Sequence, residues 1–291
     1  MLLAFKLKLL LACAAGLAGP IAVAPLVSDM AVRGTAEPAI IKIAPGSLSY
    51  REAGDFTRGW QQAEAPLRAM RFTRPLHVMR HQVSSSDYQL CVQDGACRAL
   101  DRDVAIATDR PAVQVSWHDA QAYAGWLSHK TGKTWRLPSD AEWAFAAGSR
   151  FKDDGAPVDA NDPSKRWISR YERESERDLS DTTAYAFGKF GANEHGIEDL
   201  AGNVWEWTST CFVRSRTDEA GNAGKPTVNC GVRIAEGAHR AYVTDFIRDA
   251  RAGGCAQGVP PANLGFRLVR EEPSWVASVS ARWSKTWAAR S

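Results

Sequence analysis

The sequence predicts an α+β domain with short strands, a few short helices and much irregular structure. Three observations support this. Between residues 37 and 83, short apolar runs alternate with proline and glycine, which is typical of strands joined by turns. Between residues 84 and 148, three segments carry the start signals of helices. From residue 181 to residue 272, glycine is frequent and aromatic residues recur at short intervals, which indicates irregular chain.

The clearest predicted strands are the apolar run 40–43, which Pro45 and Gly46 follow, and the run 76–79. His77 and His81 belong to this strand-like stretch. Their four-residue spacing does not place two side chains on one metal ion in an extended chain. We therefore expect both histidines to have structural roles.

Three helices are predicted next. The first opens at residues 84–88 and closes at Gly95. The second begins after the N-cap Ser116 and stops at Gly132. Its apolar face consists of Trp117, Ala120, Ala124 and Leu127. The third begins at a capping box formed by Ser139 and Glu142, and ends near Gly148.

Composition excludes several classes of protein. Apolar residues make up 45% of the 291 residues and charged residues 24%, as in soluble globular proteins and unlike disordered or collagen-like chains. The net charge is only +3, and the basic residues are interspersed with acids, so nothing indicates nucleic-acid binding. The eleven tryptophans require either an aromatic core or a stacking surface.

The N-terminus indicates export. Lys6 and Lys8 precede an uncharged run from Leu9 to Val27, which predicts a signal peptide or an N-terminal anchor in residues 1–36. The run is close to the ~20 residues that span a bilayer, so a membrane anchor stays open beside cleavage. We expect the domain, residues 37–272, and a C-terminal tail, residues 273–291, to be periplasmic or secreted.

Cysteine usage agrees with an oxidising compartment. Besides Cys13 in the N-terminal segment, the chain has five cysteines and no Cys-x-x-Cys motif: Cys91, Cys97, Cys211, Cys230 and Cys255. Cys91 and Cys97 are closest in sequence and flank a turn, so we expect a disulfide between them. The remaining three leave one thiol unpaired, and the sequence does not tell which.

Three segments in order resemble one family. The first runs from Pro111-Ala112-Val113 to Arg136-Leu137-Pro138-Ser139-Asp140-Ala141-Glu142-Trp143; then come Gly202-Asn203-Val204-Trp205-Glu206-Trp207 and Asn263-Leu264-Gly265-Phe266-Arg267. Together they resemble the formylglycine-generating enzyme, or sulfatase-modifying factor, family. The resemblance implies a C-type lectin-like α+β fold over residues 37–272. In such a fold, core packing is a better expectation for Trp205 and Trp207 than sugar stacking.

The resemblance also identifies what is missing. Active members carry two thiols just after a Gly-Gly-Ser, and these thiols bind copper(I) to oxidise a substrate cysteine. Aligned on Gly237, the two thiol positions hold Ala241 and Phe246. Copper(I) requires soft ligands, which neither residue provides. We therefore expect no copper and none of the family's known oxidation, which favours a protein that is not an enzyme.

The same segment is rich in polar residues. They are His239, Arg240, Asp245, Arg248, Asp249 and Arg251. One interpretation is a cleft that binds a polar or anionic partner, or a different acid–base site. The other is a surface loop held by ordinary ion pairs, and the sequence does not decide between them.

The resemblance further implies a structural calcium ion. The matching positions are Asp199, Gly202, Val204 and Glu206, which offer two carboxylates and loop carbonyls. The alternative is that the carboxylates of Asp199 and Glu206 accept hydrogen bonds from backbone N–H groups of the loop.

Within the family, the chain is most similar to exported accessory proteins associated with copper nitrite reductase in denitrifying bacteria. Residues 45–51, 91–97 and 253–261 carry this similarity. It implies an accessory or maturation role toward a periplasmic protein partner. The alternatives are an oxidoreductase of altered chemistry that acts on a protein or peptide in the periplasm, and a lectin-like sugar binder.

Overall fold

The computed structural model describes residues 37–101, 104–152, 168, 184–249 and 263–272. The chain divides into a unit of residues 1–34 and a unit of residues 35–291, and all the described residues belong to the second. The predicted signal or anchor, Arg251, Cys255 and the C-terminal tail lie outside the described residues. Within these residues, no helix is long and apolar enough to cross a membrane.

The three predicted helices are confirmed. They are α1 (Ser85–Gln93), α2 (Trp117–Thr131) and α3 (Asp140–Ala147), which a short 3₁₀ turn, Gly148–Arg150, follows. Each begins after a serine whose hydroxyl accepts a hydrogen bond from the backbone N–H three residues on: Ser84, Ser116 and Ser139. Gly132 ends α2 at a φ of 65°, a conformation that favours glycine.

The smaller sheet combines strands from distant parts of the chain. Its order is β1 (Ile40–Ile43), β6 (Leu76–Met79), β12 (Val269–Arg270) and β7 (Trp135–Arg136), and every pairing is antiparallel. The strand β12 therefore lies between β6 and β7. His77 of β6 is buried and pairs with Glu272, which agrees with its expected structural role.

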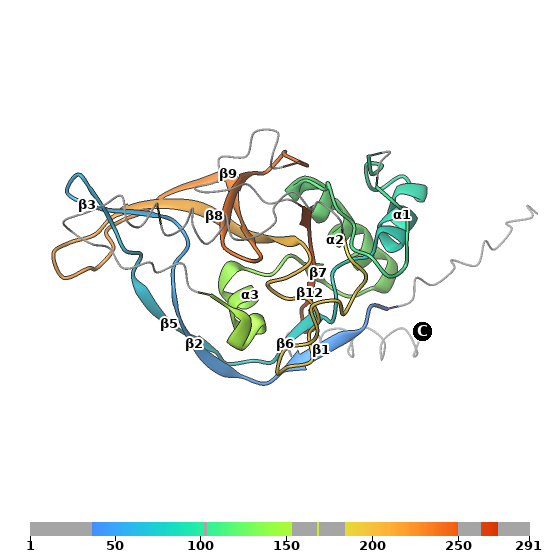
Figure 1. The fold of residues 1–291 in the computed structure, drawn as a ribbon, viewed down its shortest axis with the longest axis horizontal. Coiled ribbons are helices and arrows are strands. Elements are labelled where there is room, and N and C mark those ends of the chain that lie inside the picture. The colour runs from blue at the N-terminus through green and yellow to red at the C-terminus, as the bar shows by residue number, and fades with distance from the viewer. Residues whose placement is uncertain (1–36, 102–103, 153–167, 169–183, 250–262, 273–291) are drawn as a thin grey trace, which may run out of the picture. The chain divides into compact units, whose positions relative to one another are not determined.

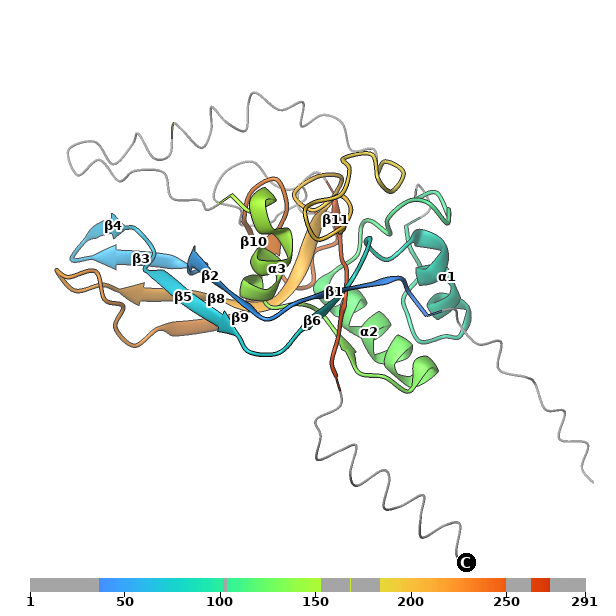
Figure 2. The same ribbon diagram turned by 90° about the horizontal axis from the view of Figure 1, so that it is seen from below.

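The larger sheet differs from the irregular chain predicted for residues 181–272. Its order is β10 (Ala241–Thr244), β9 (Thr227–Glu236), β8 (Trp205–Arg216), β3 (Asp55–Arg58) and β4 (Gln61–Ala63), with β11 (Leu264–Gly265) parallel to β8. A separate two-stranded antiparallel sheet, β2 (Gly46–Arg51) with β5 (Leu67–Phe72), completes the strands. Figures 1 and 2 show the outer ends of β8 and β9 beside β3, away from α1 and α2.

Aromatic side chains fill the core, as expected. Trp143 and Trp207 are among the largest fully buried side chains, and Trp205 is buried as well. Trp207 packs in a cluster with side chains of α1 and α2, which includes Tyr88, Tyr123 and Phe266. The predicted core role of Trp205 and Trp207 is therefore confirmed, and the α+β fold class holds.

Candidate functional site

The segment that carries the thiols in copper-binding relatives forms the β9–β10 hairpin and the turn after it. Ala241 opens β10 and is only 1% exposed, so its methyl group is part of the core. Phe246 lies just beyond β10 and is 67% exposed. A side chain at Gly237 would collide with the Trp205 ring, so glycine is needed where the hairpin crosses that indole.

Arg240 is buried in an ion-pair triad. Its side chain is 3% exposed, Nε donates to Glu236 Oε1 at 2.8 Å, and Nη2 donates to Asp140 Oδ2 at 3.2 Å. The guanidinium also donates to the backbone oxygen of Arg51. Arg240 therefore links the hairpin to the first turn of α3 and does not line an open cleft.

Arg248 has a similar role toward α2. Its Nε donates to Asp119 Oδ2 and its Nη1 to Asp101 Oδ1, both at 2.8 Å. Burial alone would raise the pKa of Asp119, but hydrogen bonds from Arg248 and Ser116 hold it below its ordinary value. Because Asp119 belongs to the capping box of α2, Arg248 ties the chain after β10 to the start of that helix.

The other polar residues of the segment lie elsewhere. The His239 ring packs edge-on against Trp205, and Asp245 pairs with His118 at 3.2 Å. Arg251 lies outside the described residues. Within the described part of the chain, Arg240 and Arg248 are thus both buried in ion pairs. Asp140 and Asp119, which bind Arg240 and Arg248, come from distant segments, whereas Glu236 lies only four residues before Arg240.

The residues predicted for calcium hold their carboxylates in different surroundings. Asp199 is fully buried, and its two oxygens accept hydrogen bonds from the N–H groups of Gly188 and Phe190 at 2.7 and 2.8 Å. These two hydrogen bonds are those expected if the Asp199 carboxylate caps backbone N–H groups of the loop. The loop turns sharply after it, since Asp199, Ala201 and Asn203 all have positive φ.

Glu206 is held by an arginine. Arg267 is fully buried, and its Nε and Nη2 donate to the two Glu206 oxygens at 2.6 and 2.7 Å. Trp143 Nε1 and Gln82 Nε2 donate to the same carboxylate. The charge of Glu206 is therefore compensated by protein groups. No group of three or more His, Cys, Asp or Glu residues suited to a metal ion occurs among the described residues.

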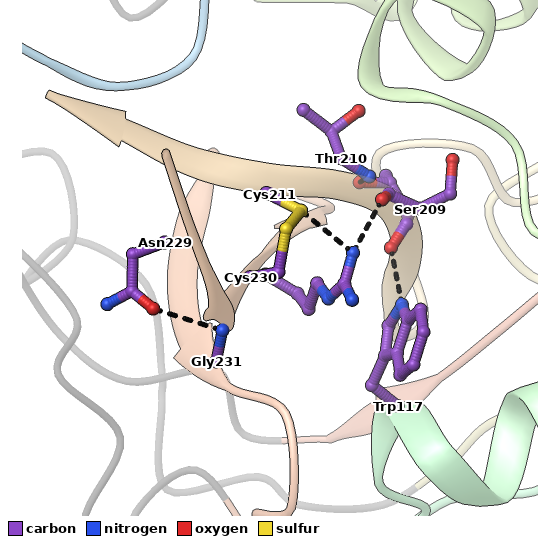
Figure 3. The surroundings of a disulfide bond; sticks show 9 residues. Trp117, Ser209, Thr210, Cys211, Asn229, Cys230 and Gly231 are labelled. Carbon is purple, nitrogen blue, oxygen red and sulfur yellow. Dashed lines mark hydrogen bonds between the residues drawn. A yellow bond between two sulfur atoms is a disulfide. The ribbon is translucent and has the colours of Figure 1, made fainter. Parts of the chain in front are cut away.

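Two disulfides are formed by the described cysteines. The predicted bridge between Cys91 and Cys97 is confirmed, with a Cα–Cα distance of 5.3 Å and both residues buried. A second bridge, which the sequence left open, joins Cys211 of β8 to Cys230 of β9. Figure 3 shows it beside Trp117 of α2.

A cavity of about 1000 Å³ opens near the small sheet. Its basic lining residues are Arg71, Arg74, His77, Lys133, Arg136 and Arg270. Several of these cations are already paired, for example Arg136 with Glu142 and Glu271. None of the residues predicted for the binding cleft or for calcium lines this cavity.

Comparisons with known proteins agree with the residues quoted above. A family profile described as "Sulfatase-modifying factor enzyme 1-like domain" matches residues 27–272. A solved structure, "Structure of PvdO from Pseudomonas aeruginosa", is similar with a TM-score of 0.53 and 22% identity over 81% of this chain and 95% of that one. At this level of identity, the similarity to the solved structure concerns the fold alone.

Curated relatives include both active and inactive proteins by name. The formylglycine-generating enzyme of Mycobacterium tuberculosis is 36% identical over 193 residues, 60% of this chain and 62% of the relative. The inactive Cα-formylglycine-generating enzyme 2 of Bos taurus is 32% identical over 164 residues, 54% of this chain and 49% of the relative. The match thus spans less than two thirds of the length of either relative.

Proposed function

Because this chain belongs to the sulfatase-modifying factor enzyme 1-like domain family, we propose that it is an exported accessory or maturation protein. In this proposal it acts on a periplasmic protein partner and performs no copper chemistry of its own. Export, with or without an N-terminal anchor, is supported by Lys6, Lys8 and the uncharged run that follows.

One observation carries the proposal. The two positions that hold copper-binding thiols in active relatives contain a buried methyl group, Ala241, and an exposed aromatic ring, Phe246. Neither side chain has an atom that ligates copper(I), and the four methionines lie far upstream in the chain. A family member with an intact fold but without these ligands is suited to binding a partner.

A link to periplasmic nitrite reduction is the narrower part of the proposal. It is supported by the similarity of residues 45–51 and 91–97 to accessory proteins of copper nitrite reductase. In the structure these stretches contain β2 and the Cys91–Cys97 disulfide. The partner would then be the reductase or a protein that matures it.

The test combines a deletion strain with the purified protein. In a denitrifying host, deletion of this chain should lower periplasmic nitrite reductase activity, and the wild-type chain should restore it. The purified protein should bind no stoichiometric copper(I) and should leave a sulfatase-type cysteine peptide unchanged. Unaltered nitrite reduction in the deletion strain would contradict the narrower link. Copper(I) binding with peptide oxidation would contradict the accessory role itself.

Calcium binding is a further part of the proposal. Asp199 and the carbonyls of Gly202 and Val204 are the residues that would hold the ion, because carboxylate oxygens have lone pairs beyond those used by Gly188 and Phe190. Glu206 fits less well, since a cation beside it would be close to the Arg267 guanidinium.

We expect calcium to raise the melting temperature of the purified, chelator-treated protein. A ligand that binds only the folded state adds about 2.7 kcal/mol at a hundred times its dissociation constant. The response should disappear in Asp199→Asn, which removes one negative charge at nearly constant volume. Equal melting temperatures with calcium and with chelator in the wild type would remove calcium from the proposal.

A further inference from the structure

The second disulfide lies in surroundings unlike those of the first. Cys230 is exposed and Cys211 is half-buried, whereas both cysteines of the Cys91–Cys97 bridge are buried in the main core. A disulfide that includes an exposed cysteine can be reached by an external thiol. A sulfur enclosed by packed side chains can be reached only when the core opens.

Local strand irregularity exposes this bridge. Cys211 of β8 is in register with Arg233 of β9, but the next residue, Phe212, is in register with Asn229. Residues 230–232 therefore face no partner in β8, and a second register shift occurs between Trp207 and Cys211. Bulges of this kind re-aim side chains and are frequent beside active sites.

A guanidinium group lies against one of the two sulfurs. Arg233 Nη1 donates to Cys211 Sγ at 3.0 Å and to the Ser209 backbone oxygen at 2.9 Å. The same guanidinium lies 3.8 Å from the centre of the Trp117 ring. The Trp117 indole is itself held by its hydrogen bond to the Thr208 backbone oxygen. These contacts fix the cation beside the sulfur.

No carboxylate forms an ion pair with Arg233 among the described residues, although Asp245 lies near enough to act on its charge. Its Nε is buried and has no hydrogen-bond partner among the described residues. Burial lowers the pKa of Arg233, yet an arginine stays protonated in proteins. A fixed, incompletely paired cation stabilises a thiolate at Cys211 far better than it stabilises the uncharged disulfide.

The Cys211–Cys230 bridge also adjoins the segment that, in active relatives, carries the copper-binding thiols. The N–H of Asp245 donates to the backbone oxygen of Gly231 at 3.0 Å. Gly231 follows Cys230, and Asp245 precedes Phe246, the exposed aromatic ring at one of the two thiol positions. A peptide that approaches Phe246 thus meets the edge of the sheet where Cys230 is exposed.

The geometry points to a thiol–disulfide exchange site at Cys211–Cys230, whose substrate is a protein or peptide dithiol. A substrate thiolate attacks Cys230 Sγ, the sulfur–sulfur bond breaks, and Cys211 leaves with the electron pair as a thiolate beside Arg233. The second substrate thiolate then attacks the substrate sulfur of the mixed disulfide, and Cys230 leaves. The substrate is oxidised to a disulfide and loses two protons and two electrons, and Cys211 and Cys230 become two thiols.

Exchange is faster when the leaving thiol has a low pKa, and a disulfide is more oxidising when its reduced form is stabilised. Arg233 provides both effects at Cys211, and the exposure of Cys230 decides which sulfur is attacked. This inference does not rest on the proposed accessory function. It can be tested with glutathione alone, without a protein partner.

The test uses the two disulfides of one protein as each other's reference. The oxidised full-length protein is equilibrated in buffers of graded reduced and oxidised glutathione, free thiols are alkylated, and each cysteine peptide is quantified by mass spectrometry. We expect Cys211–Cys230 to be half reduced under conditions about 100-fold more oxidising than Cys91–Cys97 requires. For a two-electron couple this difference is about 59 mV. After brief exposure, the glutathione adduct should be on Cys230.

Two variants isolate the role of the cation. Arg233→Met should shift the Cys211–Cys230 midpoint about tenfold toward more reducing conditions and leave Cys91–Cys97 unchanged. Arg216→Met, which removes an exposed arginine from β8, should shift neither. Reduction of both bridges together, or of Cys91–Cys97 first, would overturn the proposal, and this wild-type comparison holds even if a variant fails to fold. An adduct mainly on Cys211, or equal midpoints in both arginine variants, would overturn the assigned roles of Cys230 and Arg233.

Discussion

Arg267→Met is expected to lower the free energy of unfolding by about 3–5 kcal/mol, the usual cost of leaving one partner of a buried ion pair alone. The variant would strand the fully buried carboxylate of Glu206 among Trp143 and Gln82, which cannot neutralise it. It would also remove donors from the backbone oxygens of Met79, Arg80 and Glu198. Urea unfolding followed by tryptophan fluorescence measures the loss.

Arg270→Met is the matched control for this experiment. Arg270 lies three residues further along and is partly exposed, where it pairs with Glu37 at the surface. Such pairs contribute at most about 1 kcal/mol. Adding Glu206→Gln to Arg267→Met should recover part of the lost stability, because it removes the stranded charge. Equal unfolding midpoints for Arg267→Met and Arg270→Met would contradict the assigned role of the buried pair.

Arg240→Met is the second large effect, again about 3–5 kcal/mol. Here two carboxylates, Glu236 and Asp140, would remain buried in place of one, and both are at most 3% exposed. The variant also loses the contact between the hairpin and the start of α3. The comparison variant is Arg216→Met, at an exposed position of β8.

The measurement is again urea unfolding, and the two hypotheses for the polar segment make opposite predictions. If Arg240 lined an open binding cleft, both methionine variants would unfold at nearly the same urea concentration. The buried triad instead predicts a clearly lower midpoint for Arg240→Met alone. A difference of less than about 0.5 kcal/mol, the usual range of surface substitutions, would favour the cleft.

Helix starts could be predicted because their determinants are local. Ser84, Ser116 and Ser139 each accept a hydrogen bond from a backbone N–H only three residues away, so the whole signal lies within one turn. The Cys91–Cys97 bridge could be predicted equally well, since its cysteines are only six positions apart. The family segments then placed the core tryptophans without any knowledge of their contacts.

The long strands and the buried arginines depend on contacts across the chain. The outer part of β9, residues 227–230, is exposed on both faces and lacks the alternation that marks a strand, so its pairing with β8 decides its structure. Arg248 reaches Asp119 across 129 positions of sequence and Arg240 reaches Asp140 across 100. From the sequence alone, such residues cannot be distinguished from those of a charged surface loop. Only the folded chain shows the acidic partners with which they are buried.

The position of β12 has a consequence for the order in which the domain folds. Val269 pairs with both Val78 of β6 and Arg136 of β7, so the small sheet cannot close until the ribosome has added almost the last residue of the domain. Folds that depend on such distant pairings form slowly, because the ends of a long loop must first meet. The small sheet therefore stays incomplete until synthesis of the domain is almost finished. A secretion channel accepts chains that have not finished folding, so such a delay would suit the export proposed above.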